Sequence, residues 1–215
     1  MKKIALLMAV LICLTASCTA CAEKKKGYTE VTTAGVPSMD IEALDTSEYV
    51  SLCEYKGLTI EYLPAQEEPS SLIWEKVYFE SKIIKYPEQQ VNYYLDQISA
   101  RYIFVAKERD EPYEDVLAML GVTEATMLKE AQYMVAQDLI VEALLRAEQI
   151  ELTEEDKTKN LDKYMERYVK EYGYAEDYVK KNLMDELYDE MLYDKMIEKL
   201  VLLNTFVKVG ELVDQ

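Results

Sequence analysis

The chain has 215 residues, in which Asp and Glu outnumber Lys and Arg by 41 to 24, and it carries a net charge of -17 and no histidine. The acidic balance disfavours binding to nucleic acid. The absence of histidine excludes Ser-His-Asp and Cys-His nucleophilic machinery and most zinc chemistry. The four cysteines are all in the first quarter of the chain, without metal-site spacing. We therefore expect no enzyme, no catalytic residue, no cofactor, no metal and no nucleic-acid partner.

The first 17 residues have the organisation of a signal peptide. Lys2 and Lys3 precede an apolar run at residues 4–14, which is shorter than the roughly 20 residues of a spanning helix. The small residues 15–17 then end at Cys18. This pattern resembles the lipobox of bacterial lipoproteins, in which the cysteine is diacylated and becomes the new N-terminus. We expect lipidation of Cys18, with an ordinary secretory signal as the alternative.

Two acyl chains anchor a protein stably where one is marginal. The expected location is therefore the extracytoplasmic face of the bacterial cell membrane, with the protein held there by its lipid. Residues 18–48 are polar and show little periodicity, and we interpret them as a flexible tether. The folded domain is then expected at residues 49–215.

The domain begins with an extended arm or hairpin at residues 49–63, where apolar and polar residues alternate and Gly57 interrupts the pattern. Pro64 and Pro69 end this stretch and begin a loop. Residues 72–85 have apolar positions spaced for a short amphipathic helix, in which Trp74 is expected to be a core anchor.

From residue 86 to 204 the apolar residues recur at helical spacing. Pro87 starts a helix that reaches about Arg109, and Pro112 starts a short one that Gly121 ends. Thr123 caps a long helix to about Gln149, and a capping box at residues 153–156 begins the next, which Gly173 ends. The last helical region covers residues 175–204 and is bent near Asn182. Residues 205–209 are expected to form a strand that pairs with residues 58–62.

The expected buried faces of these helices follow from the same spacing. They consist of Val91, Tyr94, Leu95, Ile98, Tyr102 and Val105, then Val116, Leu117 and Leu120, then Leu128, Ala131, Val135, Leu139, Ala143 and Ala147, then Leu161, Tyr164, Tyr168 and Tyr172, and finally Val179, Leu183, Leu187, Met191, Ile197, Leu200 and Val201.

Four segments resemble the C-terminal chaperone domain of trigger factor. Residues 54–61 (EYKGLTIE) are similar to its DYKGLEVE entry segment, and residues 86–91 (YPEQQV) to its PEELV helix start. Residues 120–124 (LGVTE) resemble its GMTEE turn, and residues 147–156 (AEQIELTEED) its AExEgIEVTEEE junction. Each motif is weak alone, but all four occur in the family's order and approximate spacing.

The resemblance covers residues 49–209 and implies a mainly α, multi-helix, trigger factor C-terminal or SurA-like chaperone domain with a short β arm. Such a domain holds unfolded polypeptide in an open crevice. The ribosome-binding loop of trigger factor has no counterpart here, so we expect no ribosome contact. The segment between Pro64 and Lys85 is too short for an isomerase domain, although family association suggests that label.

Client binding calls for adaptable methionine and amphipathic tyrosine side chains. The candidates flank the predicted core faces, and ordinary helix packing is the competing interpretation for each. They are Tyr93, Tyr94, Tyr102, Met127, Met134, Tyr164, Met165, Tyr168, Tyr188 and Met191. Acidic clusters at residues 108–115 and 185–190 lack the spacing of a calcium loop, and we interpret them as solvated helix faces.

The sequence therefore predicts a lipid-anchored chaperone-like protein whose partners are unfolded or newly secreted polypeptides. Two alternatives remain open. One is an interaction lipoprotein dedicated to a single envelope or secretion partner. The other is a protein related to peptidyl-prolyl isomerases.

Overall fold

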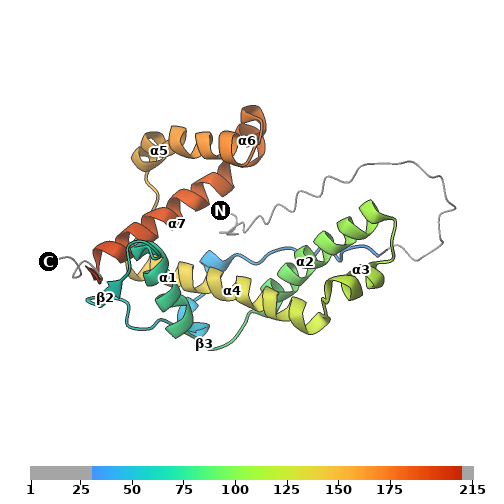
Figure 1. Cartoon of the computed structure of the whole chain (residues 1–215), viewed down its shortest axis with the longest axis horizontal. Coiled ribbons are helices and arrows are strands. Elements are labelled where there is room, and N and C mark those ends of the chain that lie inside the picture. The colour runs from blue at the N-terminus through green and yellow to red at the C-terminus, as the bar shows by residue number, and fades with distance from the viewer. Residues whose placement is uncertain (1–30, 210–215) are drawn as a thin grey trace. The chain divides into compact units, whose positions relative to one another are not determined.

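The structure is a computed structural model that describes residues 31–209 (Figure 1). The predictions on the signal peptide and on Cys18 lie outside the described residues. The strands are β1 (Val50–Ser51), β2 (Thr59–Tyr62), β3 (Lys82–Ile83) and β4 (Thr205–Lys208). The α-helices are α1 (Pro69–Glu80), α2 (Glu88–Arg109), α3 (Tyr113–Leu120), α4 (Glu124–Ala147), α5 (Glu154–Glu166), α6 (Glu176–Asn182) and α7 (Met184–Leu202). The predicted mainly α fold is confirmed.

The described residues form two compact units. One contains residues 40–86 and 136–209, and we call it the arm unit; the other contains residues 31–39 and 87–135, and we call it the α2 unit. Helix α4 contributes its first half to the α2 unit and its second half to the arm unit. Within the arm unit, α1, α5 and α6 each pack against α7. Within the α2 unit, α3 packs against α2.

The helix ends in the α2 unit follow the capping residues of the sequence. Pro87 is the N-terminal cap of α2 and Pro112 that of α3. Gly121 ends α3 with a φ of 66°, a left-handed conformation that glycine adopts without steric cost. Thr126 donates its backbone N–H to the Thr123 hydroxyl over 3.2 Å at the start of α4. These four predicted boundaries are confirmed.

The predicted capping box of α5 is also present. The Thr153 hydroxyl accepts from the backbone N–H of Asp156 over 3.1 Å, and the Asp156 carboxylate accepts from the Thr153 N–H over 2.9 Å. Further along the chain, α6 and α7 are separated at Leu183, whose φ of -123° and ψ of 16° are not helical. The predicted bend near Asn182 is therefore a break between two helices.

Two small sheets hold the extended segments. Strand β1 pairs antiparallel with β3, with Val50 opposite Ile83. Strand β2 pairs in parallel with β4, with Thr59 opposite Thr205, as predicted for residues 58–62 and 205–209. Residues 49–63 therefore form no hairpin, because their two strands pair with different partners. Gly57 lies between them at a φ of 68° and donates its N–H to the Leu203 carbonyl over 3.0 Å.

The helix predicted at residues 72–85 is displaced in the structure. Pro69 lies inside α1 at its first turn, where its missing N–H costs nothing, instead of beginning a loop as predicted. The helix ends at Glu80, and Ile84 follows β3 as an extended residue that is 53% exposed. Trp74 is half-buried and lies 5.5 Å from the ring of Tyr193 on α7, so it contributes to the α1–α7 contact.

Most of the predicted inward residues are buried or half-buried, and four are not. Leu120, Leu128, Ala147 and Tyr172 are exposed. Leu120 and Ala147 are the last residues of α3 and α4, Tyr172 is the C-terminal cap of η3, and Leu128 is the fifth residue of α4. The apolar spacing of a helix continues to its ends, but the neighbouring elements that cover the helix do not extend as far. Sequence periodicity therefore does not show where the cover stops.

Part of the predicted flexible tether is held against the folded residues. Within the arm unit, Arg146 donates from its guanidinium to the carbonyls of Glu42 and Leu44, both over 2.5 Å. Asp45 caps the short 3-10 turn η2 (Thr46–Glu48) by accepting from the Ser47 N–H over 3.1 Å.

Candidate functional site

Four tyrosines gather at the turn between α5 and α6. The two helices are drawn in orange in Figure 1. The ring of Tyr168 lies 5.2 Å from that of Tyr172 and 6.3 Å from that of Tyr174. The rings of Tyr174 and Tyr178 are stacked at 5.8 Å. Tyr172, Tyr174 and Tyr178 are 52%, 37% and 49% exposed, whereas Tyr168 is 7% exposed. We call these four residues the tyrosine cluster, which is an amphipathic surface with one buried member and three exposed ones.

The local sequence explains why the cluster forms. Helix α5 continues into the π turn η3 (Arg167–Glu171), and such turns are frequent at functional sites. Gly173 has a φ of 76°, a conformation that reverses the chain between Tyr172 and Tyr174. The N–H of Tyr174 donates to the Tyr168 carbonyl over 3.1 Å and closes the turn. The glycine therefore places aromatic side chains on both sides of one reversal.

A small apolar core lies beneath the cluster. Its buried members are Tyr164, Tyr168, Val179, Leu187 and Met191, and Leu152, Leu161, Met165, Leu183 and Tyr188 pack against it. The structure thus brings together five of the predicted client-binding residues, Tyr164, Met165, Tyr168, Tyr188 and Met191. Three of them are buried and two are half-buried. Their main role in this structure is to hold α5, α6 and α7 together.

An ion-pair network joins α5 to α7 beside this core. Arg167 pairs with Glu190 and lies 3.8 Å from Asp194. Asp194 also accepts a 2.6 Å hydrogen bond from the Tyr164 hydroxyl. Burial and this hydrogen bond raise the pKa of Tyr164 above its usual value. Burial likewise raises the pKa of Tyr168, with Glu190 adding to the effect. Both phenols therefore remain neutral hydrogen-bond donors at physiological pH.

The other five predicted residues lie in the α2 unit. Tyr93, Tyr94 and Tyr102 are on α2, and Met127 and Met134 are in the first half of α4. Tyr94 and Met127 are buried, and the remaining three are half-buried. Client binding by any of the ten residues stays a prediction.

Sequence reasoning did not name two exposed members of the tyrosine cluster, Tyr174 and Tyr178. Tyr174 directly follows Gly173, which signals a chain reversal, whereas Tyr178 lies on α6 and no local signal marks it as exposed. Other large apolar side chains at least half exposed are Phe79, Ile84, Phe104, Met119, Leu120 and Leu202. They are spread over both units. Phe79 lies 5.2 Å from the ring of Tyr78, which lies 6.0 Å from that of Trp74, so α1 carries a second group of aromatic contacts with one strongly exposed member.

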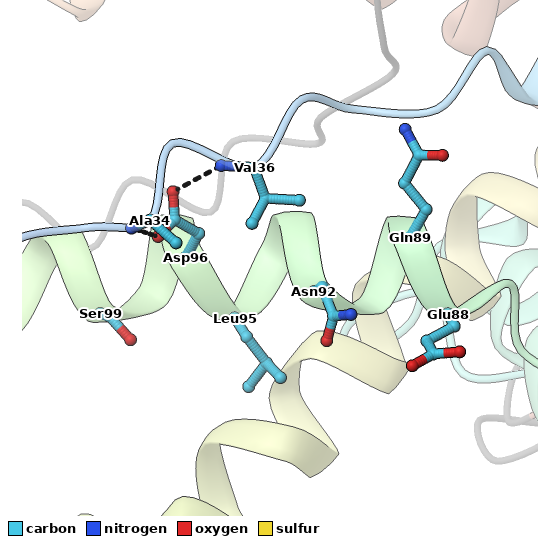
Figure 2. Close-up of a pocket in the computed structure, with 8 residues that line it drawn as sticks. All are labelled: Ala34, Val36, Glu88, Gln89, Asn92, Leu95, Asp96 and Ser99. Carbon is cyan, nitrogen blue, oxygen red and sulfur yellow. Dashed lines mark hydrogen bonds between the residues drawn. The ribbon is translucent and has the colours of Figure 1, made fainter.

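The α2 unit contains a shallow pocket of about 610 Å³ beside the N-terminal half of α2 (Figure 2). Its lining comes from two segments: Ala34 and Val36 precede the first strand, and Glu88, Gln89, Asn92, Leu95, Asp96 and Ser99 belong to α2. Figure 2 shows Asp96 pointing at the backbone of residues 34–36, to which it is hydrogen bonded. The pocket therefore lies along a line of contact between an extended segment and a helix.

Asp96 accepts from three successive backbone amides. The N–H groups of Ala34, Gly35 and Val36 donate to its carboxylate over 2.6, 2.9 and 3.2 Å. This is an amide nest for an anion, and the φ of 67° at Gly35 makes it possible. Asp96 is 9% exposed, so its charge is compensated by these amides rather than by water. No feature of residues 31–39 in the sequence indicates a partner 60 residues away.

The described residues contain no group of three or more carboxylates and cysteines placed to hold a metal ion. The acidic residues of 108–115 and 185–190 lie on α2, α3 and α7 and the loop between α2 and α3. Among the same described residues, no helix is both long and apolar enough to cross a membrane.

The chain matches no curated protein and no solved structure. One family model does match, that of the bacterial trigger factor protein C-terminus, over residues 118–202. The matched residues run from the end of α3 to the end of α7 and include α5, the tyrosine cluster and the core beneath it. The resemblance of residues 120–124 and 147–156 is thereby confirmed, and that of residues 49–117 stays a prediction. Residues 118–202 of this chain are thus similar to the C-terminus of bacterial trigger factor.

Proposed function

We propose that the protein binds unfolded or newly secreted polypeptides at the extracytoplasmic face of a bacterial membrane and keeps them from aggregating. The observation that carries the proposal is the exposed tyrosine cluster within the trigger factor C-terminal region. Tyrosine combines an apolar ring with a hydrogen-bonding hydroxyl, so it contacts many different client sequences without a shaped pocket.

The proposed mechanism is differential binding. Apolar segments of an unfolded client gain burial against Tyr172, Tyr174 and Tyr178, and they lose that contact when the client folds and buries them internally. Because the protein then binds only the unfolded form, folded clients are released without covalent chemistry. The acidic surface opposes self-association of the protein, since each copy carries the same charge.

The proposed location rests on residues 2–18, which have the charge, length and small-residue pattern of a lipoprotein signal. A lipid on Cys18 would retain the protein where secreted chains emerge. We propose no isomerase activity, because residues 64–85 are occupied by α1 and β3 and the short connections around them.

The proposal is tested by light scattering of a denatured secreted protein diluted into the purified full chain. We expect suppression of aggregation at severalfold molar excess. In Tyr172→Ser/Tyr178→Ser, client affinity is expected to fall at least about fivefold and up to about a hundredfold, since two aromatic contacts of about 0.5–1.5 kcal/mol each are lost together. Tyr86→Ser is the matched control, because Tyr86 is 38% exposed and lies outside the cluster.

An equal loss in the control, or no suppression by the unaltered chain, would contradict the proposal. A pull-down that recovers one stoichiometric partner instead of many unfolded proteins would favour a dedicated interaction protein. Catalysis of a proline-limited refolding reaction would favour the isomerase-related alternative.

A further inference from the structure

The α2 unit holds residues 34–39 through hydrogen bonds between α2 side chains and the backbone of that segment. Beyond the three amides on Asp96, the Gln90 side-chain carbonyl accepts from the Met39 N–H over 3.0 Å. The Gln89 amide donates to the Pro37 carbonyl over 3.4 Å. All five hydrogen bonds join an α2 side chain to a backbone N–H or carbonyl of the segment. In these hydrogen bonds, α2 contacts the main chain of the segment and not its side chains.

Two of the α2 side chains that contact the segment are buried, whereas much of the segment itself is exposed. Gln90 is fully buried and Asp96 is 9% exposed, and buried polar groups of this kind need hydrogen-bond partners. By contrast, Ala34, Gly35 and Pro37 are exposed. Val36 and Met39 of the segment are half-buried, and the pocket beside the segment leaves room for larger side chains. A ligand with bulkier residues would therefore gain contacts that residues 34–39 do not make.

We infer that the Asp96 and Gln90 face of α2 is a second polypeptide-binding site and that residues 34–39 occupy it as an internal stand-in for a client. The inference rests on the proposed function and adds a regulated site to it. The ligand class is a main-chain segment with a glycine turn, because three amides reach one carboxylate only when the central residue takes a left-handed φ. A client segment must displace residues 34–39 before it binds.

Two substitutions in the full chain distinguish the effect of releasing residues 34–39 from the effect of altering the binding groups on α2. Gly35→Val disfavours the left-handed φ of 67° and so releases the segment, while α2 keeps its binding groups. Asp96→Asn also weakens the hold on residues 34–36, but it removes the charged acceptor of the site itself. Thr33→Val is the control, since Thr33 is exposed on the same segment and outside the contact.

Hydrogen exchange of residues 34–36 reports release, and fluorescence anisotropy with a labelled, reduced and alkylated secreted protein reports client binding. We expect faster exchange in both Gly35→Val and Asp96→Asn. Affinity is expected to rise roughly tenfold in Gly35→Val if the segment fills the site about nine-tenths of the time. Asp96→Asn is expected to give no such rise, and Thr33→Val is expected to match the unaltered chain in both measurements.

The outcomes distinguish this inference from the proposed function. Unchanged affinity in Gly35→Val, with its amides released, would overturn the internal stand-in while client binding by the unaltered chain stands. An equal rise in Asp96→Asn would show that the segment only obstructs and that α2 is not the site. Wild-type exchange in Gly35→Val would overturn the glycine-dependent contact. Absence of binding by every variant would overturn the proposed function and this inference with it.

Discussion

The hydroxyl of Tyr164 donates to the carboxylate of Asp194 over 2.6 Å and so ties α5 to the middle of α7. The ring of the same tyrosine is 4% exposed and carries the Arg167 guanidinium 5.0 Å from its centroid. Tyr164 is therefore both a core residue and a member of the ion-pair network. The position of the tyrosine cluster relative to α7 depends on this contact, since the cluster follows directly on α5.

Replacing Tyr164 by Phe tests that dependence. The ring remains and the hydroxyl is lost, so Asp194 loses a neutral donor and keeps its neighbour Arg167. We expect the free energy of unfolding to fall by about 1.5–3 kcal/mol, as is usual for a hydrogen bond to a charged group. Urea unfolding followed by circular dichroism measures the change. The same substitution at exposed Tyr172 is expected to change stability by less than about 0.5 kcal/mol, and equal losses would contradict the assignment.

Asn204 holds the entry of the β arm in place. Its amide donates to the carbonyls of Tyr55 and Leu200 over 2.9 and 2.7 Å, and its side-chain carbonyl accepts from the Leu58 N–H over 2.9 Å. Asn204→Ala leaves these part-buried backbone groups without their partner. We expect a loss of about 2–3 kcal/mol in urea unfolding.

The control for that experiment is Asn182→Ala. Asn182 is exposed at the end of α6 and donates only to the Tyr178 carbonyl, over 3.0 Å, among the interactions described for it. Its replacement is expected to cost less than about 0.5 kcal/mol. A stability loss in Asn204→Ala no larger than this would show that the β2–β4 pairing, not the asparagine, fixes the arm.

The partly buried carboxyl group of Asp189 is expected to make the stability of the protein depend on pH. Its Oδ2 is buried and has no hydrogen-bond partner in the described part of the chain. Burial, followed by the charges of Asp185, Glu186 and Glu42, raises its pKa to about 7. Because an unfolded aspartate has a pKa of about 3.9, the folded state loses stability relative to the unfolded state as pH rises from about 4 to 7, and the loss is constant above that.

Asp189→Asn removes this loss. Its melting temperature is expected to exceed that of the unaltered chain by a few degrees at pH 8 and to approach it at pH 4.5. Exposed Asp177 on α6 provides the control, and Asp177→Asn is expected to show no such pH-dependent gain. A constant difference between Asp189→Asn and the unaltered chain across this range would contradict the ionisation argument.

The lipid anchor is tested independently of the fold. Cys18→Ala removes the thiol that a diacylglycerol would modify, so fatty-acid labelling of the protein in bacterial cells is expected to disappear and the protein to leave the membrane fraction. Cys21→Ala is the matched control and is expected to keep its label. Labelling that persists in Cys18→Ala would refute the anchor without bearing on client binding.

Local sequence signals predicted correctly the ends of several helices after residue 86, but not those of α1. Pro87, Gly121 and the Thr153–Asp156 capping box act through local backbone geometry and local hydrogen bonds, and these need no distant partner. The pairing of β2 with β4 also followed from alternation in both segments. The partner of β1 was not predicted. Residues 50–51 pair with β3, and helical spacing had placed the residues of β3 in a helix at residues 72–85.

Which tyrosine side chains are exposed to solvent depends on contacts between distant helices. Tyr164, Tyr168, Tyr172 and Tyr178 look alike in sequence, yet the first two are covered by α6 and α7 and the last two are not. The docking of residues 34–36 on Asp96 likewise joins positions about 60 residues apart. Helical periodicity shows which face of a helix is apolar. How much of that face is covered by another element depends on contacts between distant segments. No local sequence pattern encodes these contacts.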